Sequence, residues 1–349
     1  MESIEPTVTN HIWLGSIPVV ISLAENDNAN QREPLHFMAL RCAYLPLYAP
    51  TIKAHFFQKS GSTTTFTIDE ATELWYDFRG LPLKWHYPIG LLHDILSHSS
   101  LPPQQPTQST EHSLIPWKIT LHISSFPADK LFKSIPVPSL QTDPPRDFFM
   151  NSLKESEFIR HITTKKVMAL SKTDQMLLWD TISESVRAGA LETTIDQQQQ
   201  RAKLGALHDK FWSVNARLMG EYTHDATSPV GGVGQVRSVA VRLYVGWDKP
   251  FLQELVAPGP EITLLHAIRV LAPALVPSDQ VPSAESAGDP LTNHMNDLQL
   301  KGVGSNESLA AKKEFKVITH GVEIPLETPL LWLSRNFSYP DNFLHLVLG

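Results

Sequence analysis

Breaks in the sequence pattern divide this chain of 349 residues into three patterned blocks, and this division limits the possible folds more than any single motif. Three stretches rich in Ser, Pro or Gln lie at 97–113, 183–200 and 277–308. They lack apolar periodicity, so we expect disordered insertions over about 97–113, 183–206 and 276–314. The segment 136–145 contains four prolines and precedes a helical pattern, which indicates an interdomain linker.

The first block, up to about residue 127, mixes strand and helix patterns. Its clearest strand is 117–124, where Trp117, Ile119 and Leu121 alternate with polar side chains. The expected elements are strand, strand, helix, strand, helix and strand, at 12–23, 36–47, 52–59, 74–78, 89–96 and 117–124. This block is therefore predicted to be a mixed α+β domain.

The third block, 236–349, repeats this order of elements. Strands are expected at 236–246 and 251–256, followed by a helix, a strand, a short helix and a strand at 264–271, 315–318, 330–333 and 343–348. Hairpin, helix, strand, short helix and strand is the β-grasp order found in ubiquitin. Many small α+β folds share part of this order, so the pattern alone is only moderately specific.

The middle block, about 145–222, has a helical pattern that begins at Pro144 and Pro145, residues suited to a helix start. At about 100° per residue, Lys154 projects from the side of the first helix opposite its apolar half. We therefore expect Lys154 to face water near Asn151 and Glu157. Met150 and Phe158, four residues before and after, flank it. The apolar half comprises Phe148, Phe149, Leu153, Ile159 and Ile162.

Composition excludes several classes of protein. The chain is 42% hydrophobic and 19% charged, so it is not disordered as a whole. Its net charge of -7 and lack of a basic cluster argue against nucleic acid as a partner. The single cysteine fits a reducing compartment, and the acidic start is unlike a secretory signal. The uncharged segment 6–24 contains too many polar residues and prolines to cross a membrane, so we expect a soluble or peripherally bound protein.

No catalytic, metal or cofactor site is expected. His93 and His98 lie five residues apart on a predicted helix, and no His-Glu-x-x-His motif occurs. Cys42 lies in a strand-like segment and is predicted to be a small buried residue. Asp69 and Glu70 are expected to lie at the start of a helix, where carboxylates complement the positive end of the helix dipole. The glycines at 231–234 lack the spacing of a phosphate loop, and Gly349 follows the last expected strand too closely to serve as the donor of a ubiquitin-like modifier.

Four separated segments resemble the autophagy protein 5 family. They lie in the family's order and cover all three blocks: 83–92 (LKWHYPIGLL), 209–212 (DKFW), 326–334 (LETPLLWLS) and 339–346 (YPDNFLHL). The resemblance implies two ubiquitin-like β-grasp domains flanking a helix-rich domain, which agrees with the α+β pattern above. The expected organisation is a first domain at 1–127, a linker at 128–144, the helix-rich domain at 145–222, a linker at 223–235 and a second ubiquitin-like domain at 236–349.

The resemblance also implies a conjugation reaction. In this family the enzymes autophagy proteins 7 and 10 join the C-terminal glycine of autophagy protein 12 to one lysine, and the matching position here is Lys154. The reaction needs a neutral amine, whereas an ordinary lysine is less than ~0.1% neutral at pH 7. Glu155 and Glu157 would favour the ammonium form, so we expect the enzyme partner to assist deprotonation.

Further expectations follow from the family. The conjugate is expected to act as a non-catalytic, ligase-like scaffold that helps autophagy protein 3 transfer autophagy protein 8 to phosphatidylethanolamine. It is expected to bind the N-terminal helix of autophagy protein 16 and anionic membranes, in the cytoplasm and at the preautophagosomal structure. Trp13, Trp85 and Trp332 could anchor the partner helix or lie in the core. An unconjugated ubiquitin-like adaptor is the alternative, and an enzyme with its own active site is disfavoured.

Overall fold

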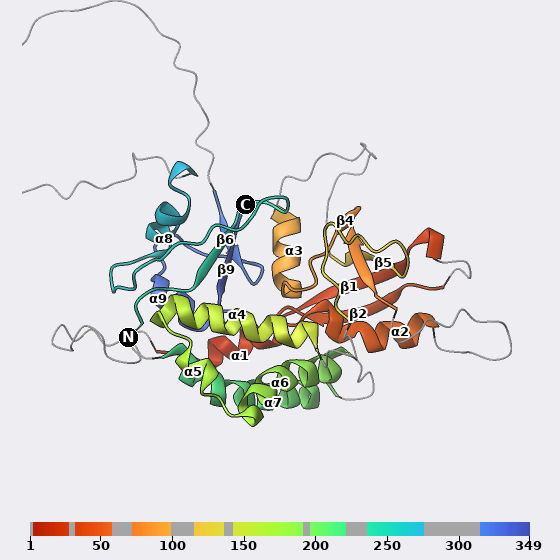
Figure 1. Cartoon of the computed structure of the whole chain (residues 1–349), viewed down its shortest axis with the longest axis horizontal. Helices are drawn as coiled ribbons and strands as arrows, with labels where there is room; N and C mark the ends of the chain where they lie inside the picture. The colour runs from red at the N-terminus through yellow and green to blue at the C-terminus, as the bar shows by residue number, and fades with distance from the viewer. Residues whose placement is uncertain are drawn as a thin grey trace, which may run out of the picture.

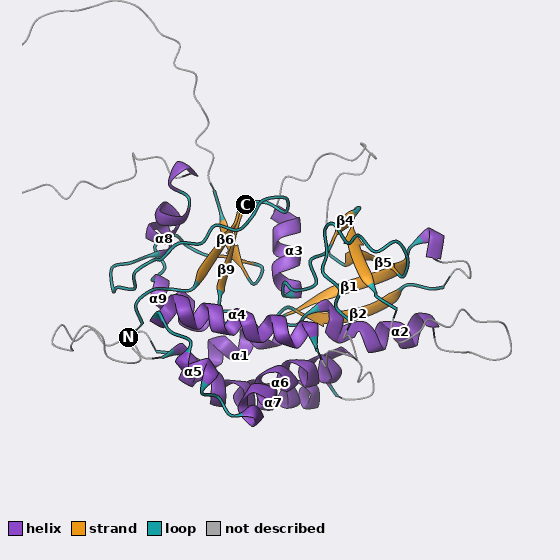
Figure 2. Ribbon diagram, viewed as in Figure 1, coloured by secondary structure: helices purple, strands orange, loops and turns teal. Residues whose placement is uncertain are grey.

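The computed structural model describes residues 3–27, 32–57, 72–98, 115–135, 142–190, 196–220, 236–275 and 315–349. Two mixed sheets and a group of helices pack together, with the long helix α4 (Pro144–His161) crossing between them (Figure 1). Most of the helices gather below the two sheets in Figure 2, and single helices also pack on each sheet. The predicted α+β class is confirmed.

The first sheet contains five strands in the order β2-β1-β5-β3-β4. The central strands β1 and β5 run parallel, with Ile21 opposite Ile119, and the other pairs are antiparallel. Helix α3 covers this sheet, and its residues 89–96 are all buried. The result is a β-grasp domain made of β1 (Ser16–Leu23), β2 (Leu35–Leu40), α2 (Ala49–Phe57), β3 (Trp75–Phe78), β4 (Leu81–Pro82), α3 (Ile89–His98) and β5 (Trp117–His122).

The second sheet contains four strands in the order β6-β9-β7-β8. Again the first and last strands, β6 and β9, run parallel to each other, here with β9 inside the sheet and β6 at its edge. Helix α8 packs on the sheet through Leu264, Ala267 and Ile268, all buried. This second β-grasp domain is made of β6 (Val241–Tyr244), α8 (Leu264–Leu271), β7 (Val317–Thr319), β8 (Val322–Glu323), α9 (Leu330–Asn336) and β9 (Leu344–Leu348).

The helical bundle joins the two β-grasp domains. Its N-terminal helix α1 packs on α7, where the Trp13 and Phe211 rings lie 5.0 Å apart and Thr9 contacts His208 at 2.9 Å. Helices α6 and α7 pack side by side below α4 in Figure 1. The bundle contains α1 (Pro6–Leu14), α4, α5 (Lys165–Met168), α6 (Lys172–Ala190) and α7 (Gln197–Met219).

Buried polar groups hold the three parts in one arrangement. The carboxylate of Asp94 on α3 pairs with Arg41 and also accepts the backbone N–H of Gly321 in the second domain at 2.8 Å. Gly321 has φ +77, and a Cβ there would lie 3.0 Å from Arg41, so glycine suits this turn on both counts. Arg160 of α4 donates to Ser334 at 2.9 Å and to the carbonyl of Asn342 at 2.6 Å.

The structure corrects one expected insertion. Residues 183–190 continue α6, and the glutamine run at 197–200 begins α7, so the expectation of a disordered insertion there is wrong. The polar residues form exposed helical faces, while Val186, Leu204 and Leu207 supply the buried faces. Gln200 also donates to the carbonyls of Ala188 and Gly189 at 3.0 Å, which satisfies acceptors at the end of α6.

Several strand limits also differ from expectation. Residues 12–14 end a helix, and 41–44 turn before a 3₁₀ helix at Leu45–Tyr48 that leads into α2. The segment 251–256 pairs with the β6 region only at two isolated bridges, Leu243 with Leu252 and Val239 with Val256. Two further short 3₁₀ helices lie at Glu25–Asp27 and Pro273–Leu275.

Other sequence-based expectations fall on residues outside the described ranges. These are residues 99–113 of the first expected insertion, 191–195 of the second and the whole of the third at 276–314, most of the proline-rich linker at 136–141, the Asp69 and Glu70 pair and the glycines at 231–234. Residues 97 and 98, also expected to be disordered, instead end α3. The domain limits stay predictions. Among the described helices, none is long and apolar enough to cross a membrane.

Candidate conjugation site

Helix α4 carries the candidate acceptor lysine. Proline occupies its first turn, and Ile162, the residue after its last, caps the helix with φ 56 and donates its N–H to the carbonyl of Phe158. The helix buries Phe149, Leu153 and Ile159. Because it packs against all three parts of the molecule, its exposed residues form only a narrow stripe: Asp147, Asn151, Glu155, Phe158 and Ile162.

Lys154 lies at the edge of this stripe. Its side chain is half-buried, and its Nζ lies 3.5 Å from the side-chain oxygen of Asn151. Within the described ranges, no carboxylate forms an ion pair with this amine. The structure therefore presents a lysine that is accessible from solvent and engaged only by a long, exposed contact.

The two apolar side chains expected beside Lys154 differ in exposure. Phe158 is 52% exposed and offers apolar surface one helical turn after the lysine. Met150 is only 8% exposed and belongs to the core shared by the first domain and the bundle. The expectation that Met150 would flank an exposed amine is corrected, because α4 is packed on more sides than an amphipathic surface helix.

Glu155 faces the second β-grasp domain. Its carboxylate forms an ion pair with Arg242 of β6 at 2.5 Å. The side-chain amide of Gln253 donates to the same carboxylate at 3.4 Å. The acid adjacent to Lys154 is therefore held by a neighbouring domain.

Glu157 is buried, contrary to the expectation that it lies beside Lys154 on a solvent-facing side. Its two carboxylate oxygens accept the backbone N–H groups of Lys166 and Val167 at 2.7 and 2.8 Å. A carboxylate at this position satisfies donors in the first turn of α5 and complements the helix dipole. Both acids near Lys154 are thus engaged elsewhere.

Aromatic residues of the first β-grasp domain cover the start of α4. The His86 ring lies 4.5 Å from that of Phe148, and Trp85 donates its ring N–H to the carbonyl of Phe132 at 2.5 Å. Burial, together with the positive charges of Lys84 and Arg242, lowers the pKa of His86 to about 4. His86 is therefore neutral at pH 7.

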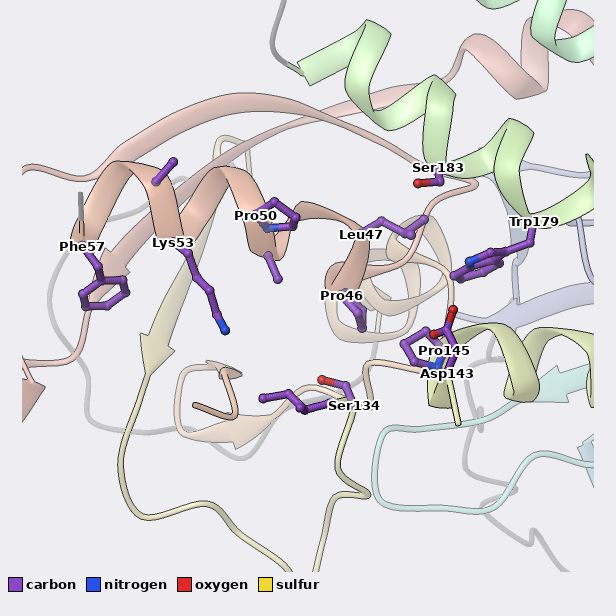
Figure 3. Close-up of a pocket in the computed structure, with 13 residues that line it drawn as sticks. Pro46, Leu47, Pro50, Lys53, Phe57, Ser134, Asp143, Pro145, Trp179 and Ser183 are labelled. Carbon is purple, nitrogen blue, oxygen red and sulfur yellow. The ribbon is translucent and has the colours of Figure 1, made fainter. Parts of the chain in front are cut away.

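A pocket of about 700 Å³ opens between the first domain and the bundle (Figure 3). Helix α2 and the turn before it form one wall, and the start of α4 with Trp179 of α6 forms the other. Lys53 and Asp143 lie on these opposite walls. Burial raises the pKa of Asp143, and the carboxylates of Asp147 and Asp180 raise it further, against a hydrogen bond from the backbone N–H of Arg146. The remaining lining is largely apolar: Pro46, Leu47, Ala49, Pro50, Ala54, Phe57, Ile135 and Pro145.

The other candidate residues lie in structural positions. Cys42 is buried, as predicted, although in a turn rather than a strand. Trp13 and Trp85 are 4% and 6% exposed and belong to the interior, and half-buried Trp332 donates to Glu5 at 2.7 Å. His93 is buried but His98 is exposed, and the described residues contain no cluster that could hold a metal ion.

Sequence reasoning missed Arg242, because its role depends on contact between segments 87 positions apart. The one signal in the sequence is its position among the apolar residues of a predicted strand, because an arginine buried there needs a partner. Arg160 was missed for the same reason, since its acceptors Ser334 and Asn342 belong to the last domain.

Two β-grasp domains packed on a helical bundle, with an accessible lysine on the bundle's central helix, define a multidomain ubiquitin-like protein. Family models of autophagy protein ATG5 match in the same order, the UblA domain at residues 12–123, the alpha-helical bundle region at 143–186 and the UblB domain at 238–348. The chain belongs to the autophagy protein 5 family, and its role lies in autophagy.

Individual proteins agree with this assignment. The chain is 29% identical to autophagy protein 5 of Oryza sativa subsp. indica, with 97% of this chain and 92% of the relative covered. It is 27% identical to autophagy protein 5 of Drosophila melanogaster, with 97% and 95% covered. The crystal structure of Kluyveromyces marxianus Atg5 superposes with a TM-score of 0.58 at 18% identity, covering 99% of this chain and 100% of that chain, which shows the shared fold.

Proposed function

We propose that this protein is the acceptor of the ubiquitin-like autophagy protein 12, joined to it through an isopeptide bond at Lys154. The observation that carries the proposal is the environment of Lys154 on α4. Its amine reaches solvent and forms no ion pair with a described residue, while both neighbouring acids are engaged elsewhere. An acceptor needs such an accessible amine and a docking surface, not a catalytic group of its own.

The proposed reaction is aminolysis of a thioester. The neutral amine of Lys154 attacks the carbonyl carbon of the modifier's C-terminal glycine, which is bound to a cysteine of autophagy protein 10. The N–C bond forms, the C–S bond breaks and the cysteine leaves as a thiolate. The amine nitrogen loses one proton, which a base on the enzyme accepts. Autophagy protein 7 supplies the activated modifier in the preceding step.

The pocket between α2 and the bundle is proposed to bind the N-terminal helix of autophagy protein 16. Apolar walls suit one face of an amphipathic helix, and Lys53 and Asp143 on opposite walls suit charged side chains at its edges. Replacing half-buried Phe57 by Ser is expected to weaken binding of a peptide with that helix sequence. Unchanged affinity would exclude the pocket as its binding site.

The conjugate is proposed to be a scaffold rather than an enzyme. By positioning autophagy protein 3, it would speed transfer of autophagy protein 8 to phosphatidylethanolamine without supplying an acid or a base. We place this activity in the cytoplasm and at the membrane of the preautophagosomal structure. Peripheral contact would come from lysines attracted to anionic lipid, and higher salt should weaken it.

The test is conjugation with purified autophagy proteins 7, 10 and 12, followed by intact-mass measurement. Lys154→Arg is expected to abolish the adduct, because a guanidinium stays protonated and cannot attack a thioester. Lys165→Arg, on exposed α5, is the matched control and should conjugate normally. An adduct on the Lys154→Arg variant would refute the assignment. Equal lipid transfer by unconjugated and conjugated protein would favour the alternative of an unconjugated adaptor.

A further inference from the structure

The pocket between α2 and the bundle has a third side, formed by Ser134 and Ile135. In Figure 3, Ser134 lies across the pocket from Lys53 of α2. Both residues follow β5 and belong to the segment expected to be an interdomain linker. They lie outside helices and strands, so no ladder of regular backbone hydrogen bonds keeps them in place.

The carboxylate of half-buried Glu73, two residues before β3, holds this side of the pocket. Its Oε1 accepts the backbone N–H and the hydroxyl of Ser134 at 2.7 and 2.6 Å. Its Oε2 accepts the backbone N–H of Ile135 at 3.2 Å. Within the described ranges, the hydrogen bonds of Ser134 and Ile135 all end on this carboxylate. Because hydrogen bonds to an ionised acceptor are roughly twice as strong as those between neutral groups, one side chain fixes both residues.

The chain just before Ser134 is anchored by other contacts. Leu131 is 6% exposed, and Trp85 donates its ring N–H to the carbonyl of Phe132 at 2.5 Å. These anchors do not involve Glu73. Removing the Glu73 carboxylate should therefore release Ser134 and Ile135 while residues 131–132 stay on the first β-grasp domain.

We propose that Glu73 is the positioning residue of this pocket, because its carboxylate holds Ser134 and Ile135 as a wall that is formed before the partner helix binds. Glu73 itself does not line the pocket, so it acts only through these two residues. A wall that is already ordered spares binding the cost of ordering it. The inference rests on the proposed function, which assigns the pocket to the N-terminal helix of autophagy protein 16.

The wall is tested first without a partner, by amide hydrogen exchange of the full chain read at single residues by mass spectrometry. Glu73→Ala should speed exchange at Ser134 and Ile135 by about tenfold or more, because both N–H groups lose their acceptor. Glu73→Gln keeps one acceptor oxygen and should have an intermediate effect. Glu25→Ala removes an exposed acid of the same domain and, as the matched control, should exchange like wild type.

The exchange pattern also separates a local role from a general one. Faster exchange confined to residues 134–135 supports the inference. Unchanged exchange there in Glu73→Ala, or faster exchange that extends through α2 and β3, would overturn it, because the carboxylate would then be dispensable for the wall or would stabilise the whole domain.

The second measurement is the affinity for a peptide with the partner helix sequence. Glu73→Ala should weaken binding by about tenfold, since the peptide must then order the backbone of two residues that wild type holds in place. Glu73→Gln should weaken it by about threefold, and Glu25→Ala should bind like wild type.

Phe57→Ser distinguishes failure of this inference from failure of the proposed function, because Phe57 lines the pocket directly. If Phe57→Ser weakens binding but Glu73→Ala does not, the pocket stands as the binding site and the role of Glu73 is refuted. If neither variant changes the affinity, the peptide binds elsewhere, and the proposed binding site fails together with the role of Glu73 in it. Weaker binding by both variants, with faster exchange only at residues 134–135, is the expected result.

Discussion

The side-chain amides of Asn215 and Asn342 donate to each other, at 2.9 and 2.8 Å, across the contact between α7 and the second β-grasp domain. Both residues are buried, and Asn342 has φ 65, a conformation that asparagine tolerates better than most residues. This reciprocal pair satisfies a donor and an acceptor on each side. It therefore favours one relative placement of the helical bundle and the domain that carries Arg242.

Asn215→Ala is expected to destabilise the protein by about 1–3 kcal/mol, because it leaves the buried amide of Asn342 without its partner. The free energy of unfolding is measured with urea. Asn151→Ala, on the exposed stripe of α4, is the control and should change it by less than about 0.5 kcal/mol. Equal stabilities for the two variants would contradict the role of the pair.

The ion pair of Asp94 predicts a pH dependence. Burial alone would raise the pKa of Asp94, but hydrogen bonds from His93 and Arg41, and the charge of Arg41, outweigh burial and lower it. A carboxyl with a lowered pKa stabilises the fold above its unfolded value near 4, and this stability is lost as pH falls through the folded pKa. Asp94→Asn should cost about 3–5 kcal/mol at pH 7, because Arg41 stays buried without its partner.

The difference in unfolding free energy between wild type and Asp94→Asn should shrink in acid. Urea unfolding of wild type and Asp94→Asn between pH 2 and 7 measures it. Glu323→Gln removes an ion pair whose two side chains are each 55% exposed and should have little effect. A constant gap between wild type and Asp94→Asn at every pH would show that Asp94 contributes through packing alone.

His86 predicts a second dependence of stability on pH, which arises from a buried neutral base rather than from a paired carboxylate. Because its folded pKa is about 4, below the unfolded value near 6.5, the unfolded chain binds the proton first as pH falls. Stability should therefore decline between pH 6.5 and 4, by roughly 1–3 kcal/mol. His86→Gln should flatten this slope, whereas His36→Gln, at an exposed position, should preserve it. The slope of unfolding free energy against pH decides the outcome.

Deleting residues 277–308 tests the expected insertion. The segment lacks apolar periodicity, and shortening a loop changes its closure entropy only slowly, so folding and conjugation should persist. Differential scanning calorimetry of the deletion variant is the measurement. Loss of the cooperative unfolding transition would mean that these residues pack on the domain.

Local patterns predicted the elements whose packing is local. Helix α8 has the predicted limits, 264–271, because its apolar spacing alone defines a buried face. The alternation in β5 identified that central strand. The glutamine run was wrongly expected to be disordered. Glutamine is a good helix former, so a polar, repetitive sequence can still provide the exposed face of α7.

The surroundings of Lys154 could not be predicted in the same way. The helical wheel located the lysine on α4 opposite its apolar half, but the wheel describes one helix and not the domains packed around it. Glu157 looked solvent-facing until α5 supplied backbone donors. The pairing of Glu155 with Arg242 depends on the relative placement of two domains, for which local sequence carries no signal.

The most direct test of the central claim is the location of the isopeptide bond in the conjugate isolated from native cells. Tryptic digestion followed by tandem mass spectrometry identifies the lysine that carries the C-terminal residues of the modifier. The account predicts one branched peptide, with the branch on Lys154. A branch on another lysine, such as Lys165 or Lys166, or a conjugate whose Lys154 remains unmodified, would contradict it.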